Sequence, residues 1–108
     1  MSIHRPGEGR LVHVVTLVCK DAEHAERCLG ALEQYGLPDA QAYGALSYRF
    51  GRKVGDPATV MLVEQWGDWD RLNALLADKV APALPVYNEL LAQPFDPARD
   101  TVRIEVTE

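Results

Sequence analysis

The sequence predicts one α+β domain, a four-stranded antiparallel sheet with helices packed on one of its faces. Four segments carry the β-branched or alternating apolar pattern of strands, and the stretches between them carry apolar residues at helical spacing. Their order along the chain is strand, helix, strand, strand, helices, strand, which is the ferredoxin-like βαββαβ arrangement. Right-handed crossovers place all of the helices on the same face of the sheet. A chain of 108 residues is long enough for one such domain with one core.

The first strand is predicted over 11–19, where apolar side chains point to both faces. A strand that is apolar on both sides must be covered on both sides. Because the helices cover one face only, we expect the same face of a second copy to cover the other, which gives a homodimer. The side chains that point one way are Leu11, Val15 and Leu17, and those that point the other way are Val12, Val14 and Val18.

The next segment is predicted to be a helix that begins after the N-cap Asp21 and ends at Gly36 and Pro38. The second and third strands are predicted over 45–50 and 59–66. They form a hairpin because the strong turn signal Gly55-Asp56-Pro57 lies between them, within a turn that spans 51–57.

After the third strand, Asp68 begins a helix, and Pro82 suits the first turn of a further helical segment. Pro94 and Pro97 are expected to end the helical part of the chain. The last strand is predicted over 101–106. Its inward-facing residues are expected to be Val102, Ile104 and Val106, and its outward-facing residues Arg103 and Glu105.

The first ten residues are polar and carry Gly7 and Gly9, so we expect a flexible N-terminal arm over 1–10 and the folded domain over 11–108. The arm lacks the apolar segment of a secretory signal. No apolar run approaches the roughly 20 residues that span a bilayer. We therefore expect a cytoplasmic protein with no membrane partner.

The charge and the metal-ligating residues exclude several classes of function. The formal net charge of −5, with no basic stripe to offset it, argues against a nucleic-acid partner. Cys19 and Cys28 are expected to be free thiols, and their spacing matches no zinc motif. The three histidines all lie in the first quarter of the chain, and no Gly-rich phosphate loop follows a strand. We expect neither a metal nor another cofactor.

Three motifs lie in the middle of the chain. They are Gly44-Ala45-Leu46-Ser47-Tyr48-Arg49-Phe50, then Asp56-Pro57, then Val63-Glu64-Gln65-Trp66 followed by Asp68 and Leu72. In this order and spacing they resemble the antibiotic biosynthesis monooxygenase (ABM) family. The resemblance runs from about Val12 to Val106 and implies a dimeric α/β barrel, in which two ferredoxin-like subunits pack sheet to sheet.

The resemblance also implies a chemistry. Several members of the family oxygenate polycyclic phenols or quinols without metal or flavin, because the deprotonated substrate itself reduces oxygen. Such a protein needs a dry aromatic pocket, a group that accepts the phenolic proton and donors for the anion. Haem-degrading members use an Asn on the first strand and a His on the helix after the Trp, and this chain has neither. Leu62 lies where anthrone-type members carry an Asn, so two alternatives stay open: a non-catalytic dimer that binds a small aromatic ligand, and a polyketide cyclase or isomerase.

The candidate site is an apolar pocket between the helices and the sheet, suited to a flat aromatic molecule. Trp66 is carried over from the family, and its indole could stack on a ring and donate one hydrogen bond. Tyr48 could orient a phenolate, and His13, a polar ring in an apolar strand, could act as a general base. For each of these three candidate catalytic residues the alternative is a packing role in the core. The candidate substrate-binding residues are Phe50, Leu62, Leu75, Leu76 and Tyr87.

Overall fold

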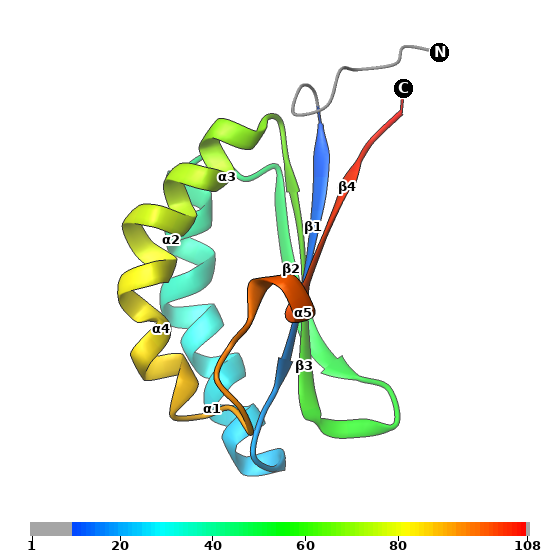
Figure 1. Cartoon of the computed structure of the whole chain (residues 1–108), viewed down its shortest axis with the longest axis vertical. Coiled ribbons are helices and arrows are strands. Elements are labelled where there is room, and N and C mark those ends of the chain that lie inside the picture. Colours follow the sequence, from blue (N-terminus) through cyan, green and yellow to red (C-terminus); the bar gives the residue numbers. More distant parts are fainter. Residues whose placement is uncertain (1–9, 108) are drawn as a thin grey trace.

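The computed structural model describes residues 10–107, in which the predicted order of strands and helices is present (Figure 1). The predicted flexible arm lies outside the described residues, apart from Arg10. The elements are β1 Leu11–Val18, α1 Ala22–Ala31, a π-helical turn Leu32–Gly36, α2 Leu37–Ala42, β2 Ser47–Lys53, β3 Asp56–Trp66, α3 Trp69–Leu75, a second π-helical turn Leu76–Val80, α4 Ala81–Asn88, α5 Pro97–Asp100 and β4 Thr101–Glu105.

The four strands form one antiparallel sheet in the order β2-β3-β1-β4. The helices α1 to α4 lie side by side on one face of this sheet, and in the described part of the chain no helix covers the other face (Figure 1). The sheet order and the single helical layer are those of the ferredoxin-like fold. The predicted α+β fold class is therefore confirmed.

The first helical region is longer than the sequence predicts. Gly36 and Pro38 do not end it, because the chain widens into a π-helical turn in which the Leu37 N–H donates to the Leu32 carbonyl, five residues back. Pro38 has no N–H to donate and its ring crowds the preceding turn, which the wider turn accommodates. Helical structure thus continues from α1 to the end of α2.

A second π-helical turn joins α3 to α4 in the same way. The Ala81 N–H donates to the Leu76 carbonyl, and Pro82 follows in the first turn of α4. The two helical segments predicted on either side of Pro82 are therefore one continuous helical stretch. The helical part ends earlier than predicted, at Asn88, and the predicted stop at Pro97 instead begins the short helix α5.

The hairpin between β2 and β3 is tighter than the predicted turn over 51–57. Strand pairing continues out to Lys53 and Asp56, so that only Val54 and Gly55 connect the strands. Gly55 has φ +83°, a conformation that favours glycine and allows the short connection.

The register of β4 against β1 reverses the prediction for its two faces. Val102 and Ile104 pair with Val14 and Val12, and they lie on the face without helices, 56% and 49% exposed. Arg103 pairs with His13 and faces the helical layer. The expected inward assignment of Val102 and Ile104 is wrong, because the register places them on the face without helices; Arg103 and Glu105 are exposed, although they lie on the helix-facing side of this strand.

The core between the sheet and the helices consists of two clusters. One is centred on Val15, Cys28 and Val60, and the other on Leu11, Trp66 and Leu72. Cys19 and Cys28 are free thiols, as predicted, and burial raises the pKa of Cys28 to about 12. No helix within residues 10–107 is long and apolar enough to cross a membrane. In the same residues, no three His, Cys, Asp or Glu side chains are grouped so that they could hold a metal ion.

Candidate functional site

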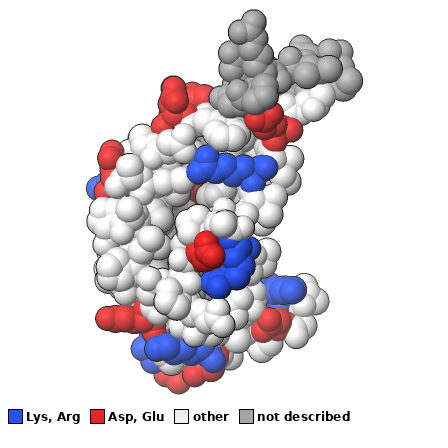
Figure 2. Space-filling view, viewed as in Figure 1, with Lys and Arg blue, Asp and Glu red and all other residues white. Residues whose placement is uncertain are grey.

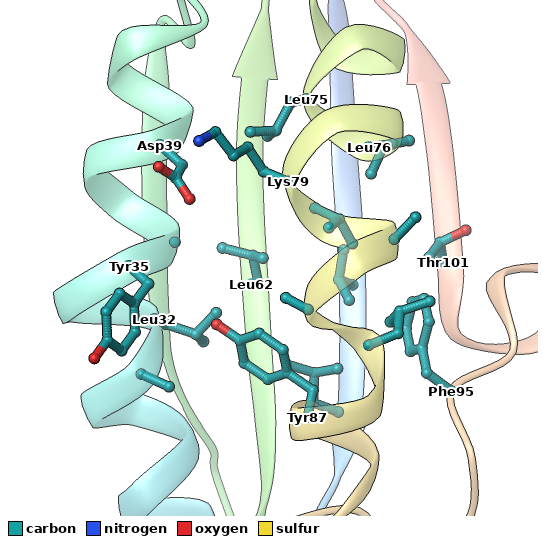
Figure 3. A pocket seen from close by; sticks show the side chains of 18 of the residues that line it. Leu32, Tyr35, Asp39, Leu62, Leu75, Leu76, Lys79, Tyr87, Phe95 and Thr101 are labelled. Atoms are coloured by element: carbon teal, nitrogen blue, oxygen red, sulfur yellow. The ribbon is translucent and has the colours of Figure 1, made fainter.

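A cavity of about 580 Å³ lies between the helical layer and the sheet (Figure 3). Its floor is the helix-facing side of β1 and β3, and aliphatic and aromatic side chains make up most of its lining. Helix-facing cavities of this size and polarity are typical of small-molecule sites. The lining includes six of the residues singled out in the sequence: His13, Tyr48, Leu62, Leu75, Leu76 and Tyr87.

The roof of the cavity is α4, which lies away from the sheet. None of its residues is buried, and Val86 is 64% exposed. Its inner side lines the cavity with Ala83, Leu84 and Tyr87. The space beneath α4 is therefore left open for a ligand and is not filled by core side chains.

Two titratable side chains form a buried pair on the floor. His13 and Glu64 lie directly opposite each other on β1 and β3, and each is 3% exposed. The distance from His13 Nδ1 to Glu64 Oε2 is 2.8 Å. Because an ionised carboxylate only accepts hydrogen bonds, Nδ1 carries the proton, and the other ring nitrogen, Nε2, is left as the base. This nitrogen has no hydrogen-bond partner among residues 10–107.

Trp66 lies one layer behind the cavity and is not part of its lining. It is fully buried, packs against Leu11 and Leu72, and donates from Nε1 to Glu64 Oε1 over 3.3 Å. Each carboxylate oxygen of Glu64 therefore accepts a hydrogen bond from a different buried donor. The sequence placed Trp66 at the pocket wall, whereas in the structure its indole orients the carboxylate that holds His13.

Tyr48 is the third polar side chain at this end of the cavity. It pairs with Glu64 across β2 and β3, and its hydroxyl lies against Gly36 in the first π-helical turn. A Cβ atom on Gly36 would lie only 2.4 Å from the Tyr48 hydroxyl oxygen. Burial, and then the negative charge of Glu64, raises the pKa of Tyr48 well above its usual value. The phenol therefore stays neutral and is a hydrogen-bond donor over the whole physiological range.

Replacing Gly36 by Ala is expected to displace the Tyr48 ring and to lower the free energy of unfolding by about 1–3 kcal/mol, as overpacking does elsewhere. Gly30→Ala is the matched control, because nothing lies within 4 Å of a Cβ at that helical position. The control should stabilise the protein by about 0.5–1 kcal/mol. Urea unfolding of both variants measures the difference, and equal effects of the two changes would contradict the contact.

Tyr87 lines the cavity, whereas Phe50 does not. Tyr87 lies on α4, and burial raises its pKa to about 12. Phe50 packs edge to face on Tyr48, with ring centroids 5.8 Å apart and an interplanar angle of 72°, and so supports that ring from behind.

The raised pKa of Tyr87 predicts a dependence of stability on alkaline pH. The folded state holds this phenolic proton more tightly than the unfolded chain, whose tyrosines titrate near 10. The stabilising contribution is full below about pH 10 and is lost as the pH rises through about 12. We expect the stability of Tyr87→Phe to fall less than that of the parent protein between these pH values. Denaturant unfolding at pH 8, 10 and 11.5 measures this difference, and parallel curves would contradict it.

Four charged side chains that line the cavity were not predicted: Asp39, Glu64, Lys79 and Arg103. Glu64 carried a signal, because it has the same strand parity as Leu62 and Trp66, and a carboxylate on an apolar strand face needs a partner. For Arg103 the sequence held no such signal, since its face depends on the register of β4.

Solved structures with the same fold include a protein named antibiotic biosynthesis monooxygenase, with a TM-score of 0.71 and 18% identity over 91% of this chain and 99% of that one. The chain has the fold of the antibiotic biosynthesis monooxygenases. A Mycobacterium tuberculosis protein has a TM-score of 0.71 at 15% identity, over 92% of this chain and 96% of its own. A dimeric ferredoxin-like protein from an uncultured marine organism has a TM-score of 0.70 at 19% identity, over 94% and 98%. Neither a family model nor a curated protein matches the sequence. The ABM resemblance is confirmed at the level of the fold.

Proposed function

We propose that the protein is a cofactor-independent monooxygenase that acts on an aromatic quinol or a polyketide-type phenol. The observation that carries this proposal is the buried His13–Glu64 pair on the floor of an otherwise apolar cavity. The fold that the chain shares with ABM structures supports it. The cytoplasmic location and the absence of a cofactor stay predictions from the sequence.

In this proposal His13 is the general base. Its Nε2 takes the acidic proton of the bound substrate, and Glu64 stabilises the imidazolium that forms, as the carboxylate does in a catalytic triad. Trp66 holds Glu64 in place through its second oxygen. Tyr48 donates a hydrogen bond to the anion of the substrate, which is favourable because its own proton is firmly held.

The electron-rich anion then reduces dioxygen. For a ring methylene, the carbon loses two hydrogens and gains one oxygen atom as a carbonyl, and the second oxygen atom leaves as water. The four electrons that reduce O₂ come from the two C–H bonds of the substrate methylene, whose hydrogens leave with the second oxygen atom as water, so the protein supplies proton transfer and a dry site. The apolar lining under α4 supports this requirement.

Two other functions would use the same residues. A polyketide cyclase or isomerase also needs a base and an anion-stabilising donor. The His13–Glu64 pair therefore supports this function as well as a monooxygenase, and a measurement of oxygen consumption distinguishes the two. A non-catalytic protein would use only the apolar cavity to bind a small aromatic ligand.

Oxygen consumption separates these functions. The protein, incubated with a panel of quinols and anthrones, should consume one O₂ for each molecule of carbonyl product above the rate of autoxidation. Heat-denatured protein is the control. Conversion of a substrate without oxygen uptake would indicate the cyclase or isomerase, and binding without any conversion would indicate the ligand-binding protein.

We also propose that the protein is a homodimer built through the open face of its sheet. Large apolar side chains on that face are exposed, among them Val18, Val63, Val102 and Ile104. A patch of this kind marks an interface, and obligate interfaces commonly bury more than about 2,000 Å². One structure with this fold is described as dimeric, which supports the proposal. Light scattering should give twice the chain mass, and a folded monomer at micromolar concentration would contradict it.

A further inference from the structure

Arg103 lines the cavity from β4, at the edge of the sheet. It lies directly opposite His13 in the register of β1 and β4, so the two side chains start next to each other on the helix-facing side. From there the Arg103 side chain reaches α3, where Nη1 donates to Asn73 Oδ1 over 3.2 Å. The guanidinium carbon lies 5.2 Å from the centre of the Trp69 ring. Arg103 is exposed, and two neutral groups on α3 contact its guanidinium.

Within the part of the chain that the structure describes, the charge of Arg103 has no carboxylate partner, in contrast to the charges of four other arginines. Within residues 10–107, no carboxylate oxygen lies within 4 Å of its side-chain nitrogens. Among the described residues its side chain makes one hydrogen bond, to Asn73, which uses one of the five N–H groups of a guanidinium. The arginines that do contact carboxylates are Arg27 with Glu23, Arg52 with Glu26, Arg71 with Asp68, and Arg99 with Asp100.

The cavity lining has three other charged side chains, Asp39, Glu64 and Lys79. Lys79 and Asp39 lie together at the opposite end, between the two helical stretches (Figure 3). Glu64 is paired with His13 on the floor. Figure 2 shows the surface hollowed between the helical layer and the sheet, with Lys or Arg side chains on the rim of the hollow. Arg103 therefore brings an exposed guanidinium, with no carboxylate partner among the described residues, to the lining of a mainly apolar cavity.

We propose that Arg103 determines the specificity of the cavity, by receiving a carboxylate or similar anionic substituent of an otherwise apolar aromatic ligand. A guanidinium with free N–H groups matches the two oxygens of a carboxylate, and its contacts with α3 lower the ordering cost of binding. The inference rests on the proposed use of the cavity as a ligand site. It does not depend on whether the ligand is then oxygenated.

A matched pair of fluorescent probes tests the inference without turnover. 8-Anilinonaphthalene-1-sulfonate carries an anionic group, and N-phenyl-1-naphthylamine has the same aromatic body without it. We expect Arg103→Gln to weaken binding of the sulfonate by about 10- to 100-fold, the effect of losing hydrogen bonds to a charged group. The affinity for the neutral probe should change by less than about threefold, and Arg103→Lys should recover part of the loss.

Two control variants test whether the loss of sulfonate affinity arises from Arg103 in the cavity. Arg27→Gln makes the same change of net charge on an exposed helix and should leave both affinities unchanged. Ala83→Phe fills the cavity from its roof and should weaken both probes alike. If Arg103→Gln weakens both probes equally and also lowers the melting temperature, the residue only ties β4 to α3 and the inference is wrong. Sulfonate binding that is absent from the parent protein, or is unaffected by Ala83→Phe, would overturn it as well.

Discussion

Replacing His13 by Gln is expected to lower the rate of substrate-dependent oxygen uptake by about 10²- to 10⁴-fold, the usual contribution of a general base. The glutamine amide can still donate to Glu64 and fills much of the same space, but it cannot accept the substrate proton. The fold should therefore persist while proton abstraction is lost. The measurement is the initial rate of oxygen consumption with a quinol or anthrone that the parent protein oxidises, together with circular dichroism of the variant.

His24→Gln is the matched control for this change. His24 also lies 2.7 Å from a carboxylate, that of Asp21, but it lies at the start of α1 outside the cavity lining. Its replacement should change the rate less than twofold. If the two variants retained equal activity, His13 would be a packing residue and another group would be the base.

Replacing Glu64 by Ala is expected to lower the free energy of unfolding by about 2–6 kcal/mol, because it removes the buried carboxylate that accepts from two buried donors. The change leaves the His13 and Trp66 ring N–H groups without acceptors in a buried site. Each unsatisfied donor costs about 1–3 kcal/mol. Urea unfolding monitored by tryptophan fluorescence measures the loss.

Glu23→Ala removes a carboxylate from an exposed pair and serves as the comparison. The Glu23 and Arg27 side chains are 79% and 58% exposed, with 3.6 Å between Glu23 Oε1 and Arg27 Nη2. Pairs of this kind contribute about 0–1 kcal/mol, so this variant should remain near the stability of the parent. A Glu64→Ala variant as stable as Glu23→Ala would show that Glu64 does not hold the floor of the cavity together.

The order of elements could be predicted because local patterns determine it. Alternating or β-branched apolar segments gave the four strands, and Asp21 and Asp68 are the N-caps of α1 and α3, as expected, each accepting from a backbone N–H three residues on. The helix ends were harder to predict. A proline normally stops a helix, but Pro38 and Pro82 each follow a π-helical turn that leaves room for the ring. Whether a chain widens there depends on the packing of the whole helical layer.

The candidate site, like the fold, could be predicted only in part from the sequence. The sequence by itself determined the strand parity of His13, Tyr48 and Glu64, because successive side chains of a strand point to opposite faces. Only the tertiary structure decided which of these side chains meet. Pairing in register brought His13 and Glu64 to 2.8 Å, and the register of β4 turned Arg103 toward the cavity and Val102 away from the helices. Register is a relation between segments far apart in the chain, and a shift by one residue would exchange the two faces of a strand.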